Sequence, residues 1–147
     1  MHVKILLITL ILSYMSTSIA RDDIGNWPFQ EAIERGLSEG VLDGSVTFYL
    51  DGNPYPKVLK NHGEYRSNKK TNGFGKSDQE ACQWALLSAL KSFQHRAQSL
   101  GANAVVNIKS NYKNNTYSHP TEYQCGAGTI MAGVALKADV VKLAATD

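Results

Sequence analysis

The strongest hydrophobic pattern in the chain lies between residues 78 and 100. Apolar side chains recur there every three or four residues, at Cys82, Leu86, Ala89, Leu90, Phe93, Ala97 and Leu100. This spacing follows the 3.6-residue period of an α-helix with one buried face. Ser77 and Glu80 form the S-x-x-E pattern of a capping box, and Gly101 suits the left-handed position that ends many helices. The pattern therefore predicts one long helix over 78–100.

Alternating patterns on both sides of this helix predict strands. Apolar and polar residues alternate over 45–50 and 104–109, as expected for half-buried strands. The segment 125–136 alternates too, but both of its faces are apolar or small, which is typical of a central strand. Residues 140–143 are expected to add a short terminal strand. Residues 57–66 contain few apolar side chains and are expected to form an edge strand protected by its charges.

The remaining segments are expected to connect these elements. Residues 21–26 read as a loose lead-in, followed by a short helix between Pro28 and Gly40. The polar stretches 68–76 and 110–124 are expected to be loops. For the segment 125–136, the alternative to a central strand is a strand that another part of the backbone approaches closely at Gly126, Gly128 and Gly133.

Together these elements predict an α+β fold. We expect a mainly antiparallel sheet of three to five strands, covered on one face by the 78–100 helix and flanked by the short N-terminal helix. The length of 21–147 suits a single domain.

Residues 1–20 have the pattern of a secretory signal peptide. Lys4 supplies a positive charge, Ile5–Leu12 is a short apolar run, and Ser18-Ile19-Ala20 places small residues where a signal peptidase reads them. The apolar run is too short for a comfortable transmembrane helix, and an uncleaved anchor is the alternative. We therefore expect an exported chain, periplasmic or secreted, that begins at Arg21 and has no transmembrane segment.

The charged residues are nearly balanced in number but unevenly distributed. The chain has 15 Lys and Arg against 13 Asp and Glu. Acidic residues predominate over 22–51, whereas the segment 57–76 is basic. Its charged residues are Lys57, Lys60, Glu64, Arg66, Lys69, Lys70 and Lys76. This local excess of positive charge favours an anionic partner.

The two cysteines, Cys82 and Cys125, are expected to form a disulfide. In an oxidising compartment a lone pair of cysteines is most often bonded, and this bond would tie the long helix to the last strand. Two buried thiols are one alternative. A reactive thiol at Cys82, near the start of the helix, is the other.

Gly75-Lys76-Ser77 matches the end of a P-loop, a motif whose backbone amides hold a phosphate. The first glycine of that motif is missing, because Lys70 occupies its place. What is left is a helix start flanked by Lys69, Lys70 and Lys76 with Ser77 at its cap, which makes a candidate anion-binding site. The alternative is a solvated basic loop in which Ser77 only caps the helix.

The sequence offers no motif for metal binding or catalysis. His62, His95 and His119 lack the H-x-x-x-H and H-E-x-x-H spacings of metal sites, so neither a metal nor a cofactor is expected. A catalytic pairing of Cys82 with a histidine competes with the disulfide, so no catalytic residue is assigned. The basic cluster is too short for nucleic acid to be an expected partner.

Several motifs resemble those of a group of small exported bacterial proteins. They are Asn72-Gly73-Phe74-Gly75-Lys76-Ser77-Asp78, Glu80-Ala81-Cys82 with Trp84, Gly101–Ile108, Thr121–Cys125 and Ile130–Lys137, and they cover most of 42–143. The group has no established activity. Some of its members carry an excinuclease-type label, which neither the motifs nor the length of this chain support.

The helix followed by Gly-Ala-Asn-Ala-Val-Val is more distantly similar to two further groups. One is the YbjQ-like family, named for heavy-metal binding, some of whose members form rings. The other is the disulfide-bonded sensor domain of the Rcs envelope-stress lipoprotein, whose lipid-anchoring cysteine this chain lacks. The resemblance implies an α+β sheet with a helix across it, and it implies no ligand set.

The expected function is that of an exported, non-enzymatic protein of unknown role that binds or assembles through its surface. The candidate surfaces are the basic segment 57–76 and the tyrosine-bearing segment 111–124. The expected partner is an anionic molecule or a protein, and an oligomer is left open. The alternative is a metal-binding protein or a small secreted enzyme.

Overall fold

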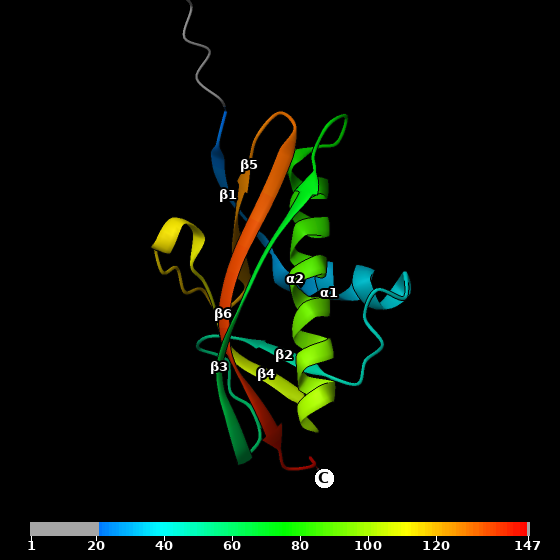
Figure 1. The fold of residues 1–147 in the computed structure, drawn as a ribbon, viewed down its shortest axis with the longest axis vertical. Coiled ribbons are helices and arrows are strands. Elements are labelled where there is room, and N and C mark those ends of the chain that lie inside the picture. Colours follow the sequence, from blue (N-terminus) through cyan, green and yellow to red (C-terminus); the bar gives the residue numbers. More distant parts are fainter. Residues whose placement is uncertain (1–20, 147) are drawn as a thin grey trace, which may run out of the picture.

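A computed structural model of the chain describes residues 21–146. The predicted signal peptide, residues 1–20, lies outside the described residues. A curled sheet is covered on one face by the long helix α2, with the shorter helix α1 packed beside it (Figure 1). In chain order the elements are β1 Asp23–Pro28, α1 Phe29–Ser38, β2 Thr47–Leu50, β3 Val58–Asn72, α2 Asp78–Leu100, β4 Ala104–Ser110, the 3-10 turn η1 Tyr112–Asn114, β5 Glu122–Ala127 and β6 Met131–Leu143. Over this part of the chain, none of the helices has the length and apolar character to cross a bilayer.

Strand β6 is the centre of the sheet. It pairs antiparallel with β3 along one side, and with β5 and then β4 along the other. Strand β1 extends the sheet beside β5 in antiparallel orientation, and β2 extends it beside β4 in parallel orientation. The α+β prediction is confirmed, but the sheet is mixed and has six strands rather than three to five. The difference arises because residues 23–28, expected in the lead-in and the first helix, form a strand.

Helix α2 spans the residues that the hydrophobic pattern indicates. The Ser77 hydroxyl accepts a hydrogen bond from the Glu80 amide at 3.1 Å, and Gly101 ends the helix with a φ of 70°. The apolar stripe of the helix packs against the sheet in one core with α1. Its largest fully buried members are Leu86, Leu87, Leu90 and Phe93. Burial of each such side chain contributes about 1.5–3 kcal/mol, so this stripe is the main source of stability.

Strand β3 departs most from the prediction. Residues 58–72 form one continuous strand, although 68–76 was expected to be a loop. The pairing with β6 runs from Val58 opposite Leu143 to Asn72 opposite Met131. Backbone hydrogen bonds hold the strand, and its one buried residue, Ser67, donates from its hydroxyl to the Ala89 carbonyl at 3.1 Å. A strand held in this way leaves little hydrophobic pattern.

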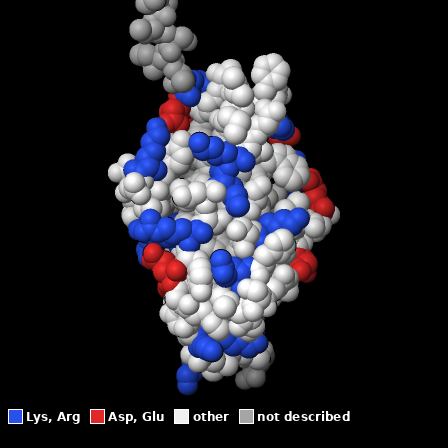
Figure 2. Space-filling model, in the orientation of Figure 1, with Lys and Arg blue, Asp and Glu red and all other residues white. Residues whose placement is uncertain are grey.

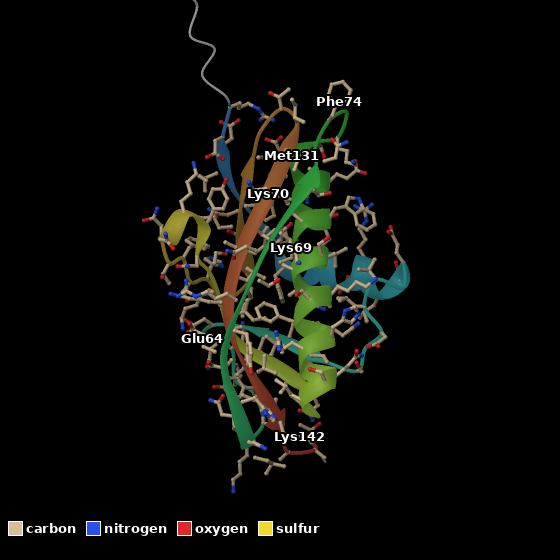
Figure 3. The ribbon with its side chains drawn as sticks, viewed as in Figure 1. Glu64, Lys69, Lys70, Phe74, Met131 and Lys142 are labelled. Atoms are coloured by element: carbon tan, nitrogen blue, oxygen red, sulfur yellow. A yellow bond between two sulfur atoms is a disulfide. The ribbon has the colours of Figure 1, made fainter. Side chains whose placement is uncertain are left out.

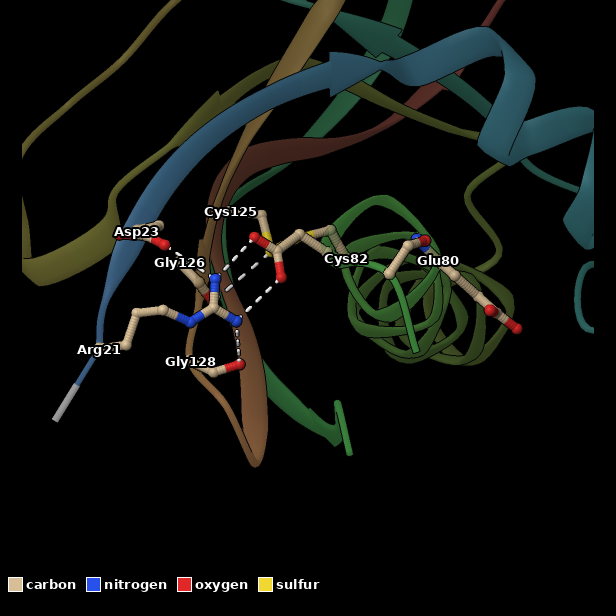
Figure 4. Close-up of polar contacts among 9 residues, drawn as sticks. Arg21, Asp23, Glu80, Cys82, Cys125, Gly126 and Gly128 are labelled. Atoms are coloured by element: carbon tan, nitrogen blue, oxygen red, sulfur yellow. Dashed lines mark hydrogen bonds and ion pairs between the residues drawn. A yellow bond between two sulfur atoms is a disulfide. The ribbon is translucent and has the colours of Figure 1, made fainter. Parts of the chain in front are cut away.

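The Cys82–Cys125 disulfide is present, as predicted. It joins the first turn of α2 to β5, with 5.9 Å between the two Cα atoms, and both residues are fully buried. The two alternatives with free thiols are therefore not seen. Figure 4 shows this bond close to Arg21. The guanidinium of Arg21 is hydrogen-bonded to Asp23 and to the Gly128 carbonyl.

Tyr123 is fully buried on β5, and its hydroxyl has no hydrogen-bond partner among the described residues. We expect Tyr123→Phe to raise the free energy of unfolding by about 1 kcal/mol, because it removes an unsatisfied buried hydroxyl and keeps the ring.

Burial, with a smaller effect of Glu31, raises the pKa of Tyr123 above its ordinary value of 10.0. Above pH 10 the folded state therefore retains a proton that the unfolded state has lost, and stability falls as the pH rises. Urea unfolding at pH 7 and pH 10.5 checks both effects. A less stable Phe variant, or one with an unchanged alkaline slope, would contradict the prediction.

Candidate binding surface

The three lysines of the candidate anion site point in different directions. Successive side chains of a strand point to opposite sides of the sheet. Lys70, opposite Gly133, therefore lies on the face away from α2, here called the open face, whereas Lys69, opposite buried Val134, lies on the α2 side (Figure 3). Lys76 lies in the turn before α2, where its Nζ donates to the Asn72 carbonyl at 2.9 Å. These lysines therefore do not form one compact site.

The amino end of α2 is occupied by the protein's own polar groups. Ser77 caps the Glu80 amide, and the carboxylates of Asp78 and Glu80 balance the positive end of the helix dipole. Two hydrogen bonds of 3.0 Å connect Asp78 to the guanidinium of Arg21, and this contact lowers the pKa of Asp78. Ser77 thus acts as a helix cap. The lysine side chains, rather than the helix end, are what the segment presents to an anion.

Lys70 borders a hollow of about 410 Å³ on the open face. Its floor contains Gly126 and Gly133, which are paired across β5 and β6. The ring of Tyr112 lies over Gly126 so closely that a methyl group at that glycine would overlap it. The close approach at Gly126 is therefore made by an aromatic side chain rather than by backbone. At Gly128 the predicted approach by backbone is confirmed, because an added methyl group would lie 2.9 Å from the Arg21 carbonyl oxygen. Through Lys70 and Tyr112, the two candidate surfaces 57–76 and 111–124 border a single hollow.

Ion pairs hold the wall of the hollow formed by Arg21 and Asp22, which directly precede β1. Arg21 donates to Asp23 and to the Gly128 carbonyl, each at 2.8 Å (Figure 4). Asp22 accepts hydrogen bonds from Lys113 and, at 3.0 Å, from the Tyr112 hydroxyl. Lys113 lowers the pKa of Asp22, whereas burial and the Asp22 carboxylate raise the pKa of Tyr112.

These contacts leave Lys70 as the cation available to a ligand in the hollow. The carboxylates of Asp22 and Asp23 are already paired, with Lys113 and Arg21 respectively. Within the part of the chain that the structure describes, no carboxylate lies within 4.0 Å of the Lys70 amine. The hollow therefore combines a positive charge, an aromatic hydroxyl and a floor without side chains.

Further basic side chains extend along the open face. Lys137 of β6 pairs with Arg66 of β3 on one side and with Lys109 of β4 on the other, so these three lie on one face with Lys70. Lys109 is 3.8 Å from Asp51, which partly offsets its charge. Figure 2, which looks onto the side of the molecule where β3 and α2 lie in front, shows Lys and Arg side chains across this side and Asp and Glu mostly toward its margins. The pairing of the strands thus brings Arg66, Lys137 and Lys109 into one row, although they lie far apart in the sequence.

The histidines lie on three different elements. His62 is on β3, His95 is on α2, and His119 precedes β5, where its Nδ1 accepts hydrogen bonds from the amides of Thr121 and Glu122. Among residues 21–146, no three His, Cys, Asp or Glu side chains gather in a way that suits a metal ion. His119 instead supports the turn that leads into β5.

Sequence reasoning missed Arg21, which fell in the expected lead-in. It included Tyr112 in the candidate surface 111–124 but did not distinguish it from the other tyrosines of that segment. The signal for Tyr112 was indirect, because the glycines at 126 and 133 leave room that some other group must fill.

Compared with known proteins, the chain matches no protein-family model and no curated protein.

Proposed function

We propose that this is an exported, non-enzymatic protein that binds an anionic partner on the open face of its sheet. The observation that carries the proposal is the hollow of about 410 Å³ bordered by both Lys70 and Tyr112. Lys70 supplies a charge without a carboxylate partner among the described residues, and the glycine floor lets a ligand approach the sheet closely. The buried disulfide suits a protein that works in an oxidising compartment.

The row of cations indicates what kind of anion suits this face. An exposed ion pair contributes only about 0.2–1 kcal/mol, so Lys70 alone would hold a partner weakly. Arg66, which is paired with Lys137, lies on the same face four residues from Lys70 along β3, about 13 Å away at 3.3 Å per residue. A partner with several negative charges, such as an anionic polymer or a charged surface, gains from all of them. Its binding weakens as salt screens the exposed charges.

Two matched charge reversals test the proposal. The double variant Arg66→Glu with Lys70→Glu acts at the row, and Lys60→Glu with Lys142→Glu makes the same change in net charge toward the other end of the β3–β6 pair. With a heparin hexasaccharide as the probe, we expect the first variant to weaken binding at least fivefold more than the second, since each lost pair is worth up to about 1 kcal/mol. Calorimetry gives the affinities, and NMR shifts at Gly126 and Gly133 locate the probe. Equal losses in both variants, or shifts away from the hollow, would overturn the assignment.

A further inference from the structure

Large apolar side chains are exposed next to the hollow, at the end of the molecule where β5 turns into β6. Phe74 is 73% exposed, Ile130 is 64% exposed and Met131 is 46% exposed. Phe74 lies in the turn between β3 and α2, and the other two lie at the turn between β5 and β6. A hydrogen bond of 2.6 Å from the Gly73 amide to the Ile130 carbonyl joins the two turns. These three side chains therefore form one apolar tip, and Figure 3 shows Phe74 and Met131 at the same end of the molecule.

Cations surround this tip. Lys70 and Lys76 lie within a few residues of Phe74 on either side, and Lys69 points to the α2 side of the same strand. The acidic groups nearby are largely matched, because Asp23 and Asp78 bind Arg21. Glu80 remains as an acidic group of the first turn of α2, so the local excess is positive but not extreme. An apolar tip with a basic border matches the layered structure of an anionic bilayer, in which acyl chains lie beneath phosphate groups.

From these two observations, the exposed apolar tip and its basic border, we infer that the tip docks on the surface of an anionic phospholipid bilayer. Phe74, Ile130 and Met131 enter the interfacial region, while Lys69, Lys70 and Lys76 face the headgroup phosphates. The inference rests on the proposed function for its basic part, and it identifies the multiply charged partner as a lipid surface. It adds an apolar contribution that a soluble polyanion does not require.

Vesicle flotation tests the inference with matched variants. The chain from Arg21 onward holds every described helix and strand and is the form to test, since it lacks the apolar run 5–12. We expect it to float with vesicles of phosphatidylglycerol and phosphatidylcholine in equal parts, but not with phosphatidylcholine alone. Phe74→Ser with Ile130→Ser should weaken binding about tenfold or more, because two large side chains no longer leave water. Leu37→Ser with Leu59→Ser, at exposed positions elsewhere, should leave binding unchanged.

The electrostatic part has its own pair of variants. Lys70→Glu with Lys76→Glu should weaken binding by at least about fivefold for each cation lost, and Lys60→Glu with Lys142→Glu by much less. All four positions are exposed, so each variant should unfold at the wild-type temperature in a circular dichroism melt.

The outcomes separate this inference from the proposed function. Binding of the heparin hexasaccharide at the hollow without vesicle binding would overturn the membrane inference and leave the proposed function standing. Vesicle binding that is insensitive to Phe74→Ser with Ile130→Ser would also overturn it, because the tip would then contribute nothing. A dimer that dissociates in that variant would assign the tip to a second copy of the chain. Absence of both heparin and vesicle binding would overturn both proposals.

Discussion

Removal of the Cys82–Cys125 disulfide is expected to lower the free energy of unfolding by about 4 kcal/mol. The bond closes a loop with a sequence separation of 43, and opening it frees the unfolded chain from that constraint. Since small domains are stable by only about 5–15 kcal/mol, this is a large share of the total. Urea unfolding of the oxidised protein and of the Cys82→Ala with Cys125→Ala variant measures the difference.

The loss should also be uneven within the molecule. Strand β5 pairs with β6 only through Gly126 opposite Gly133 and Ala127 opposite Ala132, whereas β3 pairs with β6 along nearly its whole length. The disulfide is therefore a principal link between the β1–β5 ribbon and the rest of the fold. Without it, hydrogen exchange at amides of β1 and β5 should accelerate more than exchange at amides of β3 and β6.

A loss below about 1 kcal/mol, or uniform acceleration of exchange, would show that packing alone holds the ribbon. The double alanine variant is preferred to chemical reduction because it leaves no buried thiols behind. The hollow offers an independent readout, since its floor includes Gly126 of β5 and Gly133 of β6. If the ribbon loosens, binding of the heparin probe should weaken as well, even though no cation has changed.

The elements that were predictable from the sequence are those whose side chains carry the information. Helix α2 has a capping residue, an apolar stripe and a terminal glycine. Each of these signals involves residues that are only a few positions apart in the sequence. Strand β3 has none of these signals. Its partner β6 lies more than 50 residues away in the sequence, and the two pair through backbone groups that every residue possesses. Its first part was predicted as an edge strand over 57–66, but the polar residues from 68 onward read as a loop until the partner is known.

Strand β6 was also predicted incompletely. One strand was expected over 125–136, but its first three residues are the end of β5 and 128–130 form the turn into β6. The rest of β6 was expected as a separate strand over 140–143, because Lys137 and Asp139 interrupt the apolar run. Both residues point to the open face, where no helix covers them, so they do not interrupt the strand. An antiparallel sheet can expose one face to water, which explains why Lys137 and Asp139 are tolerated within β6. This explanation requires knowing which face of the sheet is exposed, and the sequence alone does not show that.

The candidate site was predictable in its composition and not in its geometry. The basic excess of 57–76 is visible in the sequence, and the structure places Lys70 at the hollow. That Lys69 and Lys70 separate onto two faces follows from strand alternation, which a loop assignment for 68–76 hides. The alignment of Arg66 with Lys137 depends on register between distant strands. The position of Tyr112 over Gly126 depends on tertiary packing and has no local signal.

Phe93→Ala is expected to lower the free energy of unfolding by about 3–5 kcal/mol. Phe93 lies on the buried stripe of α2 with 2% of its surface exposed, so the substitution removes apolar contacts and leaves a cavity between helix and sheet. Phe74→Ala deletes the same atoms where the ring is 73% exposed, and its cost should stay within about 0.5 kcal/mol. Urea unfolding of both variants isolates the contribution of burial.

The comparison also bears on the tip of the molecule. If Phe74→Ala were as costly as Phe93→Ala, the turn between β3 and α2 would be covered in solution, and the membrane inference would lose its exposed apolar side chain. If both substitutions were mild, α2 would not be the element on which the core depends. The expected pattern, in which Phe93 is costly and Phe74 is nearly neutral, leaves Phe74 without a role in stability. An exposed aromatic side chain that does nothing for the fold is the residue expected where a protein meets an apolar partner.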